Sequence, residues 1–201
     1  GLNWSHQFND NWNIKQRFVA DLIDTQERWS MSASDTLDGD NLARVSYYIP
    51  GQRNIYYTTL DLTGHFNTGF LRHTLLIGGD YYRTDQSAHP YTADLAPIDI
   101  FNPRHNPQPI TPFTTAWSPS NNSADYFGVY GQNQIELPYG LHVMGGLRYQ
   151  YVKQWDNLTK TENSAEDAVT PRVGILWKAQ DWLSLYGNYI ENFGVSNAGA
   201  I

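Results

Sequence analysis

The stretch Phe127–Val152, FGVYGQNQIELPYGLHVMGGLRYQYV, predicts two long β-strands joined by a tight turn at Pro138-Tyr139-Gly140. Successive side chains of a strand point to opposite faces, so an alternating sequence gives a sheet with two different surfaces. On the second strand one face is apolar: Leu141, Val143, Gly145, Leu147, Tyr149 and Tyr151. The other face is largely polar: His142, Met144, Gly146, Arg148 and Gln150. A soluble β-sandwich and a membrane barrel both contain such strand pairs, so the rest of the chain has to distinguish them.

The same alternation runs through most of the sequence and predicts about eight strands. The segments that show it are 2–8, 12–31, 42–67, 71–81, 127–137, 141–152, 172–178 and 183–189. In the third of them we expect a bulge or kink at Pro50-Gly51, because proline cannot donate to a strand ladder.

Short and long connections alternate along the chain. The links near residues 10, 68, 139 and 180 have the length of hairpin turns, about 2–5 residues. Between them we expect long polar loops over 32–41, 86–123 and 157–167. Outer-membrane barrels have short periplasmic turns and long extracellular loops, whereas sandwiches mix the two ends through crossovers. Tyr139, Trp177 and Trp182 flank the tight turns, as in an interfacial aromatic girdle.

Composition excludes several classes of protein. The 201 residues are 40% hydrophobic and 14% aromatic, and no apolar run reaches the length of about 18 residues needed for a membrane helix. The net charge of −7 and the lack of a basic stripe argue against a nucleic-acid partner. There is no Cys, so disulfides and thiol chemistry are absent. No motif of nucleophilic, zinc-protease or P-loop chemistry occurs, so we expect no enzyme activity.

Three blocks of the sequence resemble one protein family. They are LTGHFNTGFLRHTLLIGGDYYR (Leu62–Arg83), the organising stretch Phe127–Val152, and VTPRVGILWKAQDWLSLYGNYIENFGVSN (Val169–Asn197). In the same order, these blocks are similar to the barrel region of TonB-dependent siderophore receptors of the ferrichrome/pyoverdine-receptor type. The resemblance covers the chain from about Asn54 onward, and segment 86–123 matches least.

The resemblance implies a bacterial outer-membrane barrel of about 22 strands, filled by an N-terminal plug. Such a receptor imports ferric siderophores with energy from the TonB–ExbB–ExbD complex, which acts through the plug. The other expected partner is outer-membrane lipid. Iron arrives as the ferric-siderophore ligand, so no cofactor and no protein metal ligand are expected. Both ends of the chain read as cut, and no signal peptide is visible at the start. We therefore expect residues 1–201 to be an open segment of the barrel domain, without plug and C-terminal strands.

Two groups of candidate site residues follow. Nine charged residues lie on polar strand faces, which would line the lumen and either contact the plug or be solvated: Lys15, Arg17, Asp61, Arg72, Asp80, Glu136, Arg148, Arg172 and Lys178. Six residues of the proline-rich loop would contact a siderophore or pack on one another: His89, Tyr91, Phe101, His105, Phe113 and Trp117.

Two alternatives remain open from the sequence. A small closed eight-stranded outer-membrane barrel with a structural or adhesion role requires the first and last strands to pair. A soluble all-β domain that binds carbohydrate requires the face with Leu141, Val143 and Leu147 to pack against a second sheet.

Overall fold

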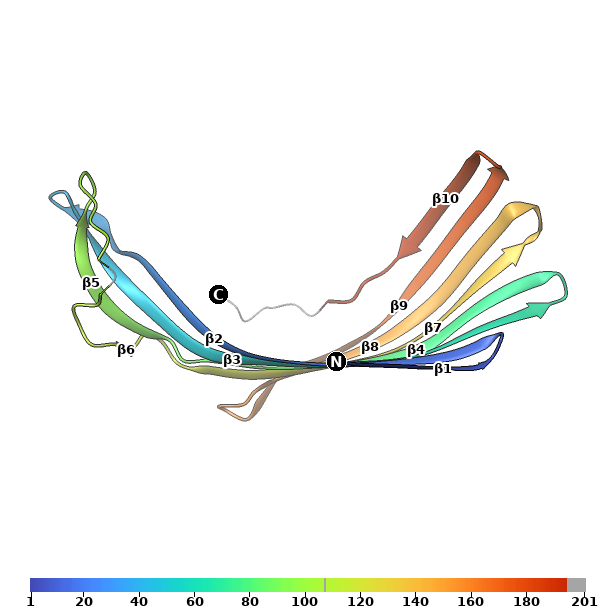
Figure 1. The fold of residues 1–201 in the computed structure, drawn as a ribbon, viewed down its shortest axis with the longest axis horizontal. Coiled ribbons are helices and arrows are strands. Elements are labelled where there is room, and N and C mark those ends of the chain that lie inside the picture. The colour runs from blue at the N-terminus through green and yellow to red at the C-terminus, as the bar shows by residue number, and fades with distance from the viewer. Residues whose placement is uncertain (107, 195–201) are drawn as a thin grey trace.

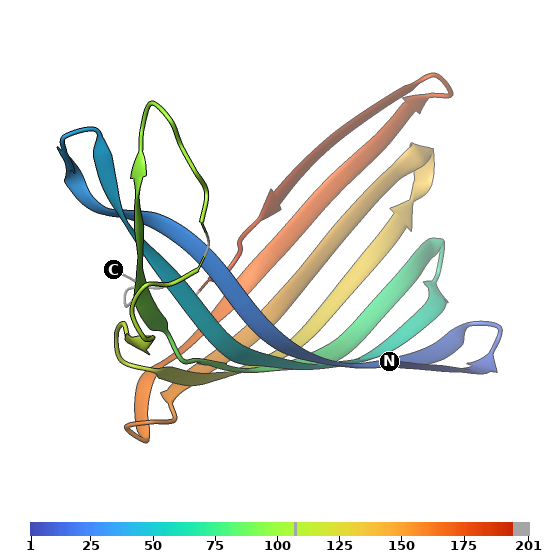
Figure 2. The same ribbon diagram turned by 60° about the vertical axis from the view of Figure 1, so that its left-hand side comes forward.

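Alternating side chains build one antiparallel sheet, bent into an open trough in the computed structural model (Figure 1, Figure 2). The structure describes residues 1–106 and 108–194. In these residues, no helix has the length and apolar character to cross a membrane. The final residues of the third resembling block, 195–197, lie outside the described part.

Eight strands follow one another through the sheet in the order β1-β2-β3-β4-β7-β8-β9-β10. Their bounds are β1 Leu2–Asn9, β2 Trp12–Asp38, β3 Asn41–Thr68, β4 Leu71–Ala88, β7 Ser120–Leu137, β8 Leu141–Asp156, β9 Thr161–Gln180 and β10 Leu183–Ile190. Two shorter strands, β5 Tyr91–Asp99 and β6 Thr114–Thr115, branch from β3. The expected up-and-down, all-β architecture is confirmed, with its tight turns at one edge.

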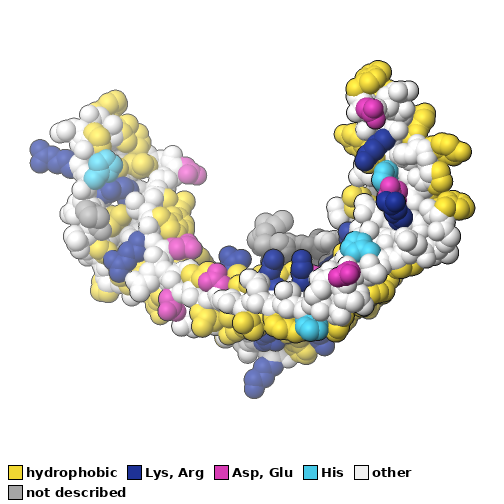
Figure 3. All heavy atoms as spheres, turned by 45° about the vertical axis from the view of Figure 1, so that its right-hand side comes forward, with side chains coloured by type: hydrophobic (Ala, Val, Ile, Leu, Met, Phe, Trp, Pro, Cys, Tyr) yellow, Lys and Arg dark blue, Asp and Glu magenta, His cyan; other side chains and the backbone are white. Residues whose placement is uncertain are grey.

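The organising hairpin has the predicted turn and register. Pro138–Gly140 forms a single 3₁₀ turn between β7 and β8, and Tyr139 and Gly140 have φ values of 63° and 71°. Ile135 pairs with Val143 and Glu136 with His142, so the apolar and polar side chains of the two strands fall on common faces. The apolar face is convex, and Figure 3 shows a band of hydrophobic side chains along the outside of the trough, with charged side chains within it and others on the outer surface away from the band.

The edges of the sheet exclude the small closed barrel. Among the described strands, β1 pairs with β2 and β10 pairs with β9, and these two end strands do not pair with each other. The soluble sandwich is wrong as well, because the sheet is a single layer and its convex face stays exposed. Leu147 is 58% exposed and Ile175 is 50% exposed, as expected of a surface that contacts lipid.

Two of the expected long loops are wrong. Strand β2 continues to Asp38 and β3 starts at Asn41, so most of the expected loop 32–41 is strand. Likewise β8 ends at Asp156 and β9 begins at Thr161, which leaves four linking residues of the expected loop 157–167. Strand ends that extend beyond a membrane have water on both faces. They therefore lose the apolar alternation by which a strand is recognised.

The third expected loop, 86–123, contains part of the sheet. On this side, residues of β3 from Gly51 to Thr68 pair with β4, and residues from Asn41 to Tyr48 pair with β5. The partner of β3 therefore changes at Pro50. Register between β2 and β3 continues unbroken through Pro50, so the expected bulge does not occur in that pairing. Proline fits here because a strand that changes partner does not need its missing N–H. The Pro50 carbonyl accepts the N–H of His89 at 2.9 Å.

Candidate functional site in the concave face

An ion pair spans the concave face between β4 and β8. Arg148 donates from Nη1 and Nη2 to the two carboxylate oxygens of Asp80, at 2.7 and 2.9 Å. The two side chains are 18% and 14% exposed, and the Arg148 guanidinium also lies 5.2 Å from the ring of Tyr130. Strand β7 separates the partners, and its Gly128 leaves the space, since a Cβ there would lie 2.3 Å from Arg148 Nη2. The pair therefore holds three strands of the wall together.

A second contact of the same kind lies beside it. The Tyr130 hydroxyl on β7 donates to Asp61 on β3 at 2.5 Å, across strand β4. Gly78 of β4 lies between them, and a Cβ at that position would be 2.6 Å from both Asp61 Oδ1 and the Tyr130 ring. Both contacts thus depend on a glycine in the intervening strand.

We expect Tyr130→Phe to lower the free energy of unfolding by about 1.5 kcal/mol, because the Asp61 carboxylate, a charged acceptor, loses the hydrogen bond that the Tyr130 hydroxyl donates to it. Tyr57→Phe is the matched control on the same face. The described residues include no hydrogen-bond partner for the Tyr57 hydroxyl, so its loss should have an effect within about 0.5 kcal/mol. Urea unfolding in detergent, followed by tryptophan fluorescence, measures both. Equal effects of the two substitutions would show that the Asp61 contact contributes no stability.

All nine charged residues predicted to face the lumen lie on this one face by register. Asp61, for example, pairs with Lys15 on one side and with Gly78 on the other. Arg72 and Glu136 are 3.9 Å apart and exposed. Across residues 1–106 and 108–194, five of the nine make no ion pair: the carboxylate Asp61 and the four cations Lys15, Arg17, Arg172 and Lys178.

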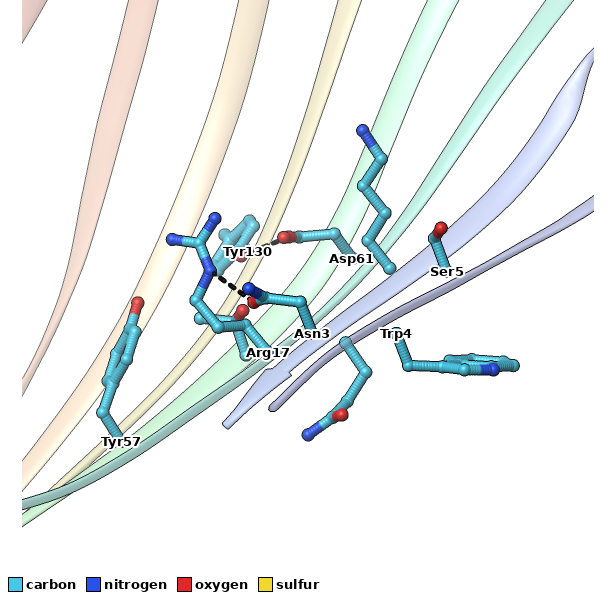
Figure 4. Close-up of a pocket in the computed structure, with 10 residues that line it drawn as sticks. Asn3, Trp4, Ser5, Arg17, Tyr57, Asp61 and Tyr130 are labelled. Atoms are coloured by element: carbon cyan, nitrogen blue, oxygen red, sulfur yellow. Dashed lines mark hydrogen bonds between the residues drawn. The ribbon is translucent and has the colours of Figure 1, made fainter. Parts of the chain in front are cut away.

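Two of these four cations border a hollow of about 390 Å³ next to β1. Figure 4 shows Arg17 and Asp61 pointing into the concave side, and Trp4 pointing to the opposite side. Arg17 donates from Nε to Asn3 Oδ1 at 3.2 Å, which leaves the end of its guanidinium directed inward. Lys15 and Tyr57 also line the hollow. This arrangement can accept an anionic group from whatever occupies the trough.

At the other end of the strands an aromatic row lies on the same concave face. Trp29 of β2 pairs with Tyr47 of β3, and their rings stack at 4.4 Å. Trp117, in the link between β6 and β7, lies 5.5 Å from Tyr47. Trp29 is 43% and Trp117 51% exposed, so the row offers aromatic surface for a ligand.

The six loop residues predicted to bind ligand do not form one cluster. Trp117 joins the concave aromatic row, whereas Tyr91 and Phe113 contact Tyr48, which lies on the opposite face of β3. His105 lines a separate pocket together with Phe113. The other two side chains, Phe101 and His89, are exposed, and Phe101 follows the end of β5.

Sequence reasoning missed several residues of these sites. Trp29 and Tyr47 were not identified because the alternation predicts segments 12–31 and 42–67 as strands but does not give the register between them. Tyr57 and Tyr130 carry no charge, so they were not among the charged residues predicted to face the lumen. The register of β2 on β3 and of β4 on β7 is the signal that places them.

The turn between β8 and β9 carries a pH-sensitive contact outside the membrane. Thr159 and Leu158 donate backbone N–H groups to Asp156 at 3.1 and 2.8 Å, which lowers the pKa of that carboxyl. A lowered pKa means that this stabilisation is present above the ordinary value of 3.8 and is lost as the pH falls through the folded value.

We therefore expect hydrogen-exchange protection of the Leu158 and Thr159 amides to fall as the pH drops below about 4. Asp156→Asn keeps an oxygen acceptor and removes the titration, so its protection should not depend on pH in this range after correction for intrinsic exchange. Protection that is independent of pH in the natural protein would contradict the assignment.

The comparison with known families identifies the chain. The family model described as TonB dependent receptor-like, beta-barrel matches residues 1–200. The chain belongs to this family. Its members are outer-membrane receptors and transporters, not enzymes. The described residues contain no group of three or more His, Asp or Glu side chains placed to hold a metal ion.

Curated relatives of this TonB-dependent receptor chain are named as receptors. The metal-pseudopaline receptor CntO of Pseudomonas aeruginosa is 28% identical over 94% of this chain, and the match spans 28% of that relative. The ferrioxamine B receptor of Salmonella typhimurium is 27% identical over 96% of this chain and 27% of its own length. The chain thus spans between a quarter and a third of these two relatives.

Solved structures share the fold. The ferric preacinetobactin receptor BauA of Acinetobacter baumannii superposes with a TM-score of 0.73 at 22% identity, over 94% of this chain and 29% of that one. This likeness confirms the curved antiparallel wall of a TonB-dependent barrel.

Proposed function

We propose that this chain is a segment of the barrel domain of an outer-membrane receptor that takes up ferric siderophores with energy from the TonB–ExbB–ExbD complex. The family membership supports a receptor, and the relatives named above bind metal–pseudopaline and ferrioxamine B by their printed names. In this proposal residues 1–201 supply about eight strands of a larger barrel, and a plug domain fills the concave side.

The aromatic row Trp29–Tyr47–Trp117 is the observation that carries the proposal. It lies on the concave face, at the end of the strands away from the tight turns, where an extracellular ligand first reaches the trough. Siderophores present aromatic and amide surfaces, and exposed tryptophan rings bind such surfaces by stacking and by burial of apolar area.

The cations of the concave face support the second half of the proposal. Lys15, Arg17, Arg172 and Lys178 lie near the tight-turn half of the wall, and no carboxylate of the described chain neutralises them by an ion pair. A plug domain with acidic side chains on its surface would satisfy them. Arg148 and Asp80 instead satisfy each other, so we assign this pair to the wall.

Uptake in whole cells tests the function. The gene is deleted from its host, and cells under iron limitation receive radioactive iron as a hydroxamate, a catecholate or a citrate complex, or bound to the siderophores of the host's own culture medium. We expect the deletion to abolish uptake of one complex, a plasmid copy to restore it, and a TonB-deficient strain to show the same loss. Unchanged uptake of every complex would contradict the proposal.

A further inference from the structure

A pocket of about 450 Å³ lies on the convex side of the wall, where β2 and β3 extend past the apolar band. Its cationic lining residues are Arg28 of β2 and Arg44 of β3. The β2–β3 register is unbroken from Trp12 to Ser32, so side chains alternate regularly between the two faces along this part of β2. Arg28 therefore lies on the same face as Phe18 and Leu22. Trp29 also lines the pocket, but the same alternation places its side chain on the concave face, so the pocket lies on the opposite face of the wall from the trough through which we propose that cargo passes.

Both arginines hold their positive charge without a carboxylate partner. Arg44 donates from Nε and Nη2 to the Ala96 carbonyl at 3.0 and 2.8 Å, and from Nη2 to the Asn106 carbonyl at 3.4 Å. The Arg28 guanidinium lies 4.6 Å from the centre of the Tyr48 ring. No salt bridge to Arg28 or Arg44 occurs in the described chain, although the whole sequence has an acidic net charge of −7.

The segment after β5 folds over this face and makes the pocket a built site. The Ile110 N–H donates to the Asp94 carbonyl at 2.8 Å, and Leu95 forms a β-bridge with Pro109. Leu95 is buried beneath this cover with 4% exposure. From the cover, His105, Asn106, Gln108 and Phe113 line the pocket. Two fixed cations, neutral hydrogen-bonding groups and an aromatic ring together suit an anion that carries several acceptor oxygens.

The position on the wall indicates the source of that anion. Phe18 and Leu22 are 40% and 66% exposed on the convex face below the pocket. Arg28 lies six residues beyond Leu22 on the same strand, about 20 Å along it at 3.3 Å per residue, and less in height because barrel strands are tilted. When the chains of a lipid lie against the apolar band, its polar groups lie on the convex side beyond the end of that band, where the pocket is. We propose that Arg28 and Arg44 bind a phosphate group of a membrane lipid.

Native mass spectrometry of the intact, delipidated protein in detergent tests the proposal. The added probes are phosphatidic acid, which exposes a phosphate monoester, and phosphatidylcholine, whose phosphate is masked by choline. We expect tighter binding of phosphatidic acid, and a loss of about tenfold in its affinity in Arg28→Gln, the size of one charge-assisted hydrogen bond. Arg28→Glu should lose more, and Arg28→Lys should keep most of the affinity.

Arg53→Gln is the matched control, because Arg53 lies on the concave-side register of β3 next to Ile23 and outside the pocket. Its affinity for phosphatidic acid should equal that of the natural protein. Equal losses in Arg28→Gln and Arg53→Gln would overturn the site and leave only general charge attraction. Inorganic phosphate that binds in detergent as tightly as phosphatidic acid would overturn the assignment to a lipid.

Discussion

We expect Arg148→Leu to lower the free energy of unfolding by about 3 kcal/mol, the lower end of the range for removal of one partner of a buried pair. The substitution leaves the Asp80 carboxylate, only 14% exposed, without the two hydrogen bonds that now neutralise it. It also removes the contact of the guanidinium with the Tyr130 ring. The lower end applies because both side chains retain some access to water.

Urea unfolding in lipid vesicles measures this effect, with Arg172→Leu as the control. Arg172 lies on the same face of β9 and makes no ion pair within the described residues, so its replacement should change stability by less than about 1 kcal/mol. A double replacement of Arg148 and Asp80 by leucine should recover much of the loss, because no unpaired charge then remains. Equal effects of the two single arginine substitutions would show that Arg148 is only solvated.

We expect Trp29→Ala to weaken binding of the ferric complex by about 10- to 100-fold, as for an aromatic anchor at the centre of a contact surface. Trp29 presents one side of its ring to Tyr47 and leaves 43% of its surface exposed. Its removal deletes both the ligand contact and the support for Tyr47. Trp117→Ala should act in the same direction with a smaller effect, because its ring is tilted and farther from Tyr47.

Quenching of tryptophan fluorescence by the complex that the uptake assay identifies gives the affinity. Trp182→Ala serves as the control, since Trp182 lies in the turn between β9 and β10 at the opposite end and is 81% exposed. Its affinity should be unchanged. Retention of full affinity in Trp29→Ala would remove the aromatic row from the binding site and leave the family assignment untouched.

The strands that cross the apolar band were predictable because one of their faces contacts lipid. Alternation of apolar and polar residues then identifies the strand and its two faces, as it does for Leu141 to Tyr151. The turn at Pro138-Tyr139-Gly140 was predictable from its residue types. The nine charged residues of the concave face followed from the same alternation, and the register places all of them on that face.

The extensions of β2, β8 and β9 were not predictable, because in water neither face of a strand has to be apolar. Segment 86–123 was assigned as a loop for the same reason, although β5 continues the sheet through its pairing with Tyr48. The separation of Tyr91 and Phe113 from Trp117 could not follow from the sequence either, since the covering segment passes from one face of the sheet to the other.

By itself, the sequence determined the fold class and the face on which each strand residue lies, because both depend on local patterns of period two, and three blocks in the same order carried the family resemblance. Only the tertiary structure decided that the sheet is open, that Arg148 pairs with Asp80, and that Trp29, Tyr47 and Trp117 form one row. These depend on contacts between strands that are distant in sequence. Gly78 and Gly128 show the reason. Each leaves space for side chains from neighbouring strands, and the alternation within one strand does not say which side chains those are.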